Sequence, residues 1–173
     1  HVENLIVGTI ADQNVFNSLT QTDAFGRMNY NGFTQGDFVY RDENNNLQPY
    51  FWKSFEISED GKQIDFTIPL HDGEPVTVDD VVFTFEYMRD VRKNGSLQNL
   101  TEVKVTGDDS ASLIFSEPDA YYWINSSCNN NACVYAKHIW EGIDDPTTLD
   151  GPEAAIGCGP YKLVSYDSDA QVS

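Results

Sequence analysis

The hydrophobic and polar positions of this chain fall into short, distinct stretches, and the first of them is continuously apolar. Residues 5–10 read Leu-Ile-Val-Gly-Thr-Ile, a pattern typical of a strand that is buried on both faces. Residues 11–17 are mostly polar, with Phe16 among them. We therefore expect a loop at the end of this strand, the place where ligands tend to bind in α/β sheets.

Residues 36–70 predict a β-meander, because apolar residues there either cluster before a turn or alternate with polar ones. A polar turn at residues 42–46 separates the first strand from the rest. Apolar residues then alternate at 55–57 and again at 64–68. The Asp60-Gly61 pair between these two runs is a strong signal for a hairpin turn.

The clearest helix start in the chain lies at Thr77. Asp80 stands three residues later, so the two side chains can form a capping box at the helix N-terminus. The apolar positions that follow fall on one helical face: Val78, Val81, Val82, Phe85 and Met88. We expect this helix to end by Asn94 and Gly95.

The remaining pattern combines strands with short helices. Residues 103–115 predict a second hairpin, and residues 121–124 form an aromatic cluster. A short helix is expected at 134–143, and a final strand at 161–166 after a sharp bend at 157–160. The fold class predicted by this mixture is α/β, in the broad sense that includes mixed α+β arrangements.

The charge of the chain is strongly negative, with 28 Asp and Glu residues against 10 Lys and Arg residues and a net charge of −18. Such a surface repels phosphate backbones, which excludes nucleic acid as a partner. Solvation and a salty medium both explain the excess. No apolar run approaches the length of a membrane-spanning helix, and the first residue is His1. We therefore expect either a cytosolic protein or a mature or truncated piece of an exported protein, and His1 favours a processed or engineered start.

The three cysteines allow two arrangements. Cys128 and Cys133 flank a polar loop and could close a short disulfide in an oxidising compartment, which would leave Cys158 as the odd cysteine. The alternative is a zinc site that combines all three thiols with His138, although the chain has no Cys-x2-Cys pair. The residues alone leave both readings open.

Catalytic signatures are scarce. The chain has neither a Gly-x-Ser-x-Gly elbow nor a His-Glu-x-x-His helix. His71 beside Asp72 could act as an acid/base pair, but a solvated turn explains two polar residues before Gly73 and Pro75. We expect a binding module and no enzyme. The alternatives are a secreted hydrolase domain that uses His71 and Asp72, and a structural cell-surface module.

Five stretches in a fixed order carry a recognisable family pattern. The last is Ile-Gly-Cys-Gly-Pro-Tyr-Lys-Leu at residues 156–163, and the others lie at residues 60–62, 71–86, 103–118 and 135–140. Together they resemble the extracellular solute-binding protein family 5, which comprises the peptide-, dipeptide- and nickel-binding subunits of ABC importers. The chain departs from the family pattern at Asp37, Ala136 and Cys158.

The resemblance implies a periplasmic-binding-protein-like fold of type II, in which two lobes close over a ligand. Residues 1–35 would form the first strand and cleft loop of lobe one. Residues 36–155 would form a β-rich accessory subdomain, and residues 156–173 a return strand to lobe one. On this reading the chain is an N-terminal portion that lacks the second lobe.

The resemblance also implies a site. Ligand contacts would come from Asn14, Val15 and Phe16 after the first strand, and from Arg92 and Ser96 after the capped helix. Tyr30 and Trp123 are interpreted as core residues. The whole protein would be an extracytoplasmic, lipoprotein-type monomer without cofactor or metal site. It would deliver a peptide, a nickel chelate or another small solute to an ABC permease in the membrane.

Overall fold

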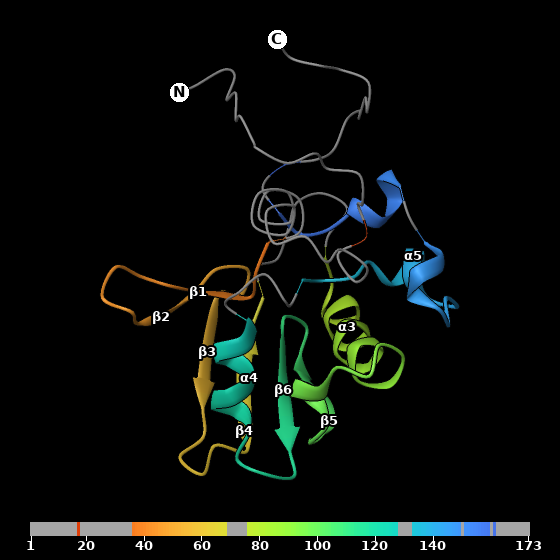
Figure 1. The fold of residues 1–173 in the computed structure, drawn as a ribbon. Helices are drawn as coiled ribbons and strands as arrows, with labels where there is room; N and C mark the ends of the chain where they lie inside the picture. Colours follow the sequence, from red (N-terminus) through yellow and green to blue (C-terminus); the bar gives the residue numbers. More distant parts are fainter. Residues whose placement is uncertain are drawn as a thin grey trace, which may run out of the picture.

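The described part of the chain is a β-sheet with helices packed against it (Figure 1). The computed structural model describes residues 17, 36–68, 76–127, 133–149, 151–159 and 161. The strand expected at residues 5–10, most of the strand expected at 161–166, and Tyr30 lie outside these residues. Within the described residues, no helix is both long enough and apolar enough to cross a membrane.

The two predicted hairpins are confirmed and join into one antiparallel sheet. Strand β3 (Ser54–Ile57) pairs with β4 (Gln63–Thr67), and β5 (Leu100–Gly107) pairs with β6 (Ser110–Phe115). Strands β4 and β6 lie side by side, which gives the order β3-β4-β6-β5. Alternate residues of β4 are buried, and β6 adds an apolar core residue at every second position, so one face of the sheet supplies the core.

The meander predicted for residues 36–70 is wrong in one respect. Strands β1 (Val39–Arg41) and β2 (Leu47–Pro49) pair only with each other and form a separate two-stranded sheet. The chain between β2 and β3 turns inward, because Phe51 and Trp52 are buried in the core. The backbone N–H groups of Tyr50 and Trp52 both donate to the carbonyl of Phe38, and this contact holds the turn.

Helix α3 (Val78–Asp90) begins as the sequence predicts. The Thr77 Oγ1 accepts from the backbone N–H of Asp80, and the Asp80 carboxylate accepts from the backbone N–H of Thr77, so the capping box is complete. The predicted apolar face is buried except for Val82, which is half-buried. The chain leaves the helix through Lys93, whose φ of 55° is left-handed and cannot continue a right-handed helix.

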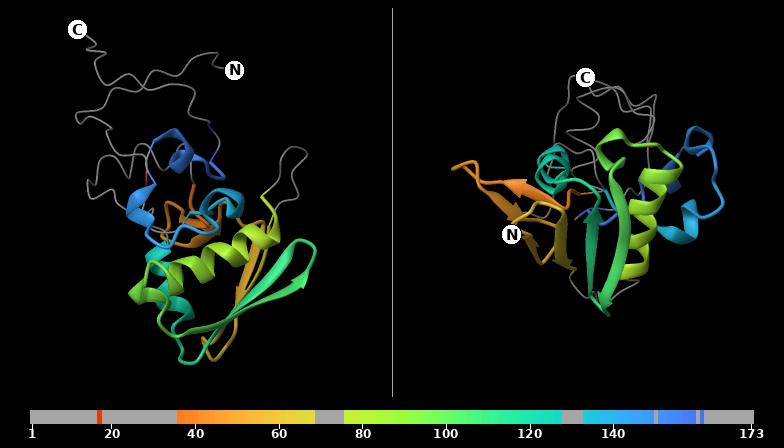
Figure 2. Two further views of the ribbon diagram at one scale, coloured as in Figure 1. Left: turned by 90° about the vertical axis from the view of Figure 1, so that its right-hand side faces the viewer. Right: turned by 90° about the horizontal axis from the view of Figure 1, so that it is seen from below.

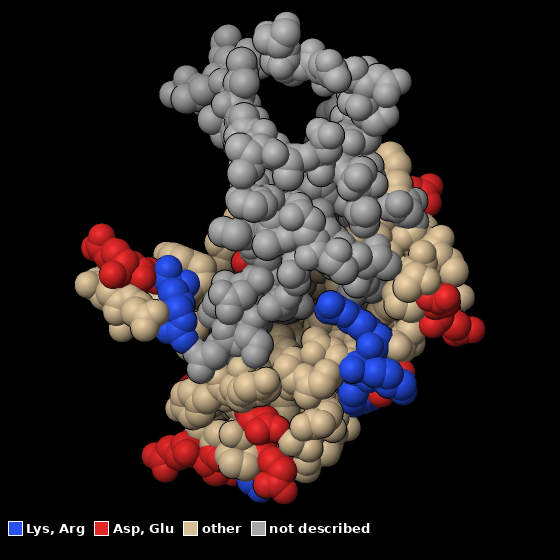
Figure 3. Space-filling view, in the orientation of Figure 1, with Lys and Arg blue, Asp and Glu red and all other residues tan. Residues whose placement is uncertain are grey.

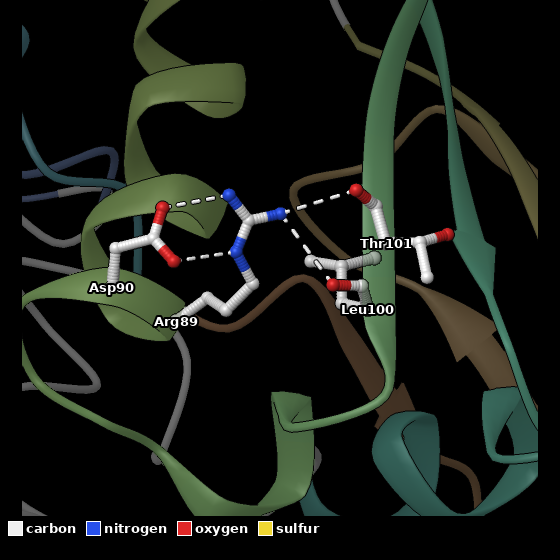
Figure 4. A network of polar contacts seen from close by, with 4 residues as sticks. All are labelled: Arg89, Asp90, Leu100 and Thr101. Atoms are coloured by element: carbon white, nitrogen blue, oxygen red, sulfur yellow. Dashed lines mark hydrogen bonds and ion pairs between the residues drawn. The ribbon is translucent and has the colours of Figure 1, made fainter.

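Arg89 links the end of α3 to the edge strand of the sheet, and it also forms an ion pair with Asp90 within the helix. The Arg89 guanidinium makes two hydrogen bonds to the Asp90 carboxylate, at 2.6 and 2.7 Å. It also donates to the carbonyls of Leu100 and Thr101 in β5, at 3.4 and 3.5 Å (Figure 4). The hydrogen bond from Arg89 lowers the pKa of the Asp90 carboxyl. This contact satisfies backbone carbonyls on the outermost strand of the four-stranded sheet.

Helix α4 (Ala120–Ser127) was not predicted as a helix, although its aromatic residues were noted. Trp123 and Ile124 are buried while Tyr121 and Tyr122 are exposed, so the helix is amphipathic. It lies in front of the sheet in Figure 1, and the view from below in Figure 2 separates it from α3. The interpretation of Trp123 as a core residue is confirmed, because only 1% of its surface is exposed.

The short helix expected at residues 134–143 is confined to α5 (Lys137–Trp140). It begins at Lys137, because the backbone of Ala136 is extended, with φ of −65° and ψ of 111°. In the segment before the helix, the backbone N–H of Tyr135 donates a hydrogen bond of 2.9 Å to the Thr84 Oγ1 of α3. The helix ends before Gly142, whose φ is 89°. Three single turns complete the described elements: η2 (Gly95–Leu97), η3 (Pro146–Thr148) and η4 (Pro152–Ala155).

We expect Thr84→Val to destabilise the protein by about 1–3 kcal/mol, because the buried N–H of Tyr135 would lose its acceptor. The hydroxyl also donates 2.7 Å to the carbonyl of Asp80. Thr84→Ser keeps the hydroxyl and is the control, with a smaller loss. The thermal unfolding midpoint measures the effect. Equal shifts for the two variants would show that the hydroxyl does not hold the segment before α5.

Candidate functional site

One residue of the N-terminal segment is described, and it is anchored firmly. The Asn17 side chain is completely buried, with 0% of its surface exposed. Its amide nitrogen donates to the carbonyls of Pro146 and Leu149, each at 2.6 Å. These partners are 129 and 132 residues away in sequence. The N-terminal segment is therefore attached to the η3 turn at this point.

The anchor bears directly on the predicted site, because it follows Asn14, Val15 and Phe16 without a gap. Those three residues lie outside the described residues. Their role as ligand contacts stays a prediction. Asn17, the next residue, is held by two hydrogen bonds to the η3 turn.

Arg92 lies just beyond helix α3 and is half-buried. Its backbone N–H donates 3.0 Å to the carbonyl of Tyr87, which closes the helix end. Within the described residues no ion pair engages its guanidinium, in contrast to Arg89. The positive charge is favourable beside the negative end of the helix dipole. An arginine side chain carries five N–H donors, so Arg92 is suited to bind an anionic group.

Ser96 has a local role in the structure. Its backbone N–H and its Oγ donate to the Asn94 side-chain oxygen, at 3.1 and 2.9 Å, and this contact caps the η2 turn. Arg92 thus lies just before the η2 turn and Ser96 lies within it. These contacts are all within the protein, and the assignment of Arg92 and Ser96 as ligand contacts stays a prediction.

Gly159, near the end of the described residues, packs beside Gly36. A Cβ atom built on Gly36 would lie 3.6 Å from the Cα of Gly159, and the φ of Gly36 is 66°. Cys158, the residue before Gly159, packs against the apolar core. Burial of this sulfur, together with the neighbouring Cys133, raises the pKa of the Cys158 thiol to about 12. Cys158 is therefore a neutral thiol at physiological pH.

The other predicted chemistry falls outside the described residues. His71, Asp72 and Cys128 are not described, so the structure tests neither the acid/base pair nor the Cys128–Cys133 disulfide. His138 is exposed in α5, whereas Cys133 is buried. Across the described stretches, no group of three His, Cys, Asp or Glu residues is arranged to hold a metal ion.

The described surface carries its acidic residues in several places. In Figure 3 the Asp and Glu side chains are spread over separate parts of the surface, and Lys and Arg side chains form a few small groups between them. Several of the acidic side chains are used in local turns. A hydrogen bond from the backbone of Asn46 lowers the pKa of Asp42, and the hydroxyl of Ser58 lowers the pKa of Asp60. The acidity therefore supports turns and solvation and defines no single binding patch.

Sequence comparison identifies a family. Residues 46–173 match the family model described as bacterial extracellular solute-binding proteins, family 5, middle part. The chain is 26% identical over 178 residues to the oligopeptide-binding protein AppA of Bacillus subtilis, an alignment that covers 94% of this chain and 32% of AppA. The chain thus spans about a third of the length of the curated relatives it matches.

Comparison with solved structures agrees with the family match. The structure of AppA in complex with a nonapeptide superposes with a TM-score of 0.75 at 22% identity, over 93% of this chain and 34% of AppA. NikZ from Campylobacter jejuni, in complex with Ni(L-His), superposes with a TM-score of 0.71 at 22% identity, over 91% of this chain and 32% of NikZ. The fold is that of the N-terminal portion of a type II periplasmic binding protein, as the sequence predicted.

Proposed function

Because the chain belongs to family 5 of the bacterial extracellular solute-binding proteins, we propose that it is part of the solute-binding subunit of an ABC importer. In this proposal the complete protein holds a peptide or a related small solute between two lobes and passes it to a membrane permease. The observation that carries the proposal is the family match over residues 46–173.

The proposed organisation follows the predicted boundaries. Residues 1–35 supply the first strand and cleft loop of lobe one, residues 36–155 form the accessory subdomain, and residues 156–173 return to lobe one. Two contacts join these proposed units to one another: Asn17 is bonded to the η3 turn, and Gly159 packs beside Gly36.

The protein acts outside the cytoplasm, as a monomer, and binds its solute without converting it. Support comes from the family, whose description is extracellular and solute-binding. AppA and NikZ are solved with a nonapeptide and with a nickel-histidine chelate, and neither ligand is named as a reaction product. No observation favours the hydrolase that would use His71 and Asp72, or a purely structural module.

Isothermal titration of the full-length protein with short peptides, nickel-histidine chelates and sugars tests the solute class. We expect saturable one-to-one binding of peptides or of the nickel chelate. Binding of sugars alone would overturn the proposed solute class, and the absence of any binding would overturn the proposed function.

Arg92→Ala tests the ligand contact proposed for the segment after α3. If the guanidinium donates to an anionic group of the solute, its removal weakens binding by roughly tenfold to a hundredfold, the usual range for a charge-assisted hydrogen bond. Ser96→Ala is expected to have a smaller effect, because its hydroxyl is engaged with Asn94. The matched control is Lys93→Ala. Equal dissociation constants for Arg92→Ala and Lys93→Ala would remove Arg92 from the site.

A further inference from the structure

Two glycosylation motifs follow helix α3, and their surroundings in the structure differ. The chain contains three Asn-x-Ser/Thr motifs, which can accept an N-linked sugar in an exported protein. They begin at Asn94, Asn99 and Asn125. A motif of this kind is usable where its asparagine lies in an accessible turn or loop. The third lies within helix α4, so we compare the surroundings of the first two.

The motif at Asn94 forms an open turn. The Asn94 side-chain oxygen accepts from the backbone N–H and from the Oγ of Ser96, at 3.1 and 2.9 Å. Both hydrogen bonds go to the oxygen, and within the described residues none engages the side-chain nitrogen of Asn94. Gly95 is exposed, and a Cβ atom built on it would have no other atom within 4 Å. The turn therefore has free space around it, and the nitrogen that would carry a sugar is unused.

The motif at Asn99 is part of the packed sheet. The Asn99 side-chain nitrogen donates a hydrogen bond of 2.5 Å to the Asp119 carboxylate. Leu100 begins strand β5 and is buried, with 3% of its surface exposed. The Thr101 Oγ1 donates 2.9 Å to the carbonyl of Ile114 in β6. All three residues of this motif are engaged in the fold, and a sugar on the Asn99 nitrogen would displace the Asp119 carboxylate.

We propose that Asn94 is a site of N-linked glycosylation and that Asn99 is not. The donor is a sugar or oligosaccharide that is attached through its C1 atom to a polyprenyl phosphate or diphosphate. The bond between C1 and the phosphate oxygen breaks, C1 bonds to the Asn94 Nδ2, and the proton lost from the amide goes to the leaving phosphate. The inference rests on the proposed location outside the cytoplasm, because this modification belongs to exported proteins.

The difference between the two motifs holds whether the sugar is transferred before or after folding. A sugar attached to Asn99 before folding would prevent the hydrogen bond to Asp119, so such chains would be absent from the folded protein. After folding, the Asn99 nitrogen is already bonded. Asn94 can keep both hydrogen bonds from Ser96 while its nitrogen carries a sugar, because those bonds go to the oxygen.

Glycopeptide mapping tests the assignment. The full-length protein is isolated from its native host and digested with a protease that cuts after glutamate. Cleavage after Glu86 and Glu102 releases peptide 87–102, which contains both asparagines. Fragmentation that leaves the sugar attached then locates it by mass. We expect a sugar on Asn94 and an unmodified Asn99. A peptide without any sugar, or a sugar on Asn99, would overturn the proposal.

Three variants expressed in the same host complete the test. Ser96→Ala destroys the first motif and should remove the sugar, whereas Ser96→Thr keeps the motif and should retain it. Thr101→Val destroys only the second motif and is the matched control, so its sugar on Asn94 should be unchanged. A sugar that persists in Ser96→Ala and is lost in Thr101→Val would place the modification on Asn99 and contradict the proposal. These masses do not depend on solute binding, so the result is separate from that of the titration.

Discussion

Phe85→Ala is expected to destabilise the protein by about 3–5 kcal/mol, the loss that follows when a large ring is removed from a packed core. Phe85 is completely buried in α3, with 0% of its surface exposed. Its ring lies 5.3 Å from that of Phe38, 6.2 Å from that of Phe66 and 5.2 Å from that of Trp123. These three rings come from the start of β1, from β4 and from α4, so one truncation loosens three elements.

The matched control is Phe83→Ala in the same helix. Phe83 is half-buried, and its ring lies 5.4 Å from that of Tyr87. Its truncation should cost less than half as much, because less apolar surface is removed from contact. Urea unfolding of both variants provides the comparison. Similar losses at positions 83 and 85 would show that the aromatic cluster around Phe85 is not the centre of the core.

Asn17→Asp is expected to damage both stability and solute binding. The replacement removes two donated hydrogen bonds and places a carboxylate against the carbonyls of Pro146 and Leu149 at a fully buried position. An uncompensated buried charge costs about 3–5 kcal/mol. If Asn14, Val15 and Phe16 contact the solute as proposed, the dissociation constant for the solute should rise as well, because Asn17 directly follows them in the chain.

The pH dependence of the stability of Asn17→Asp distinguishes the cost of a buried charge from a simple loss of packing. Burial disfavours the charged form of the introduced carboxyl, so its pKa is raised in the folded state above the unfolded value of about 4. The charge penalty is therefore absent below pH 4, where the carboxyl is protonated in both states, and it grows as the pH rises through the folded pKa. The loss of unfolding free energy caused by Asn17→Asp should become smaller as the pH falls toward 4. Asn17→Ala should show no such recovery.

Local signals in the sequence predicted the elements that depend on neighbours along the chain. The capping box of Thr77 and Asp80 and the Asp60-Gly61 turn are both correct, because each involves residues at most three positions apart. Helix α4 was missed, since its run of four large side chains resembles a core cluster as much as a helix. The length of α5 was overestimated, because the backbone of Ala136 and Glu141 on either side of it is extended. The segment before the helix is bonded to Thr84, 51 residues earlier, a contact that the local sequence does not reveal.

The features of the fold that could not be predicted depend on contacts between residues far apart in the sequence. The pairing of β4 with β6 and the separation of β1 and β2 into their own sheet depend on which strand edges meet in space. The burial of Asn17 could not be predicted, because a single Asn in a polar stretch has the same local sequence whether it is solvated or buried.

The complete protein is expected to hold a solute reversibly between its lobes and to release it unchanged. In the decisive experiment, a peptide that binds in the titration is added to the full-length protein and the complex is separated. The peptide released on unfolding is then analysed by mass spectrometry. We predict close to one peptide per protein, recovered at its original mass. Recovery of cleaved peptide would refute reversible binding and would point to an enzyme.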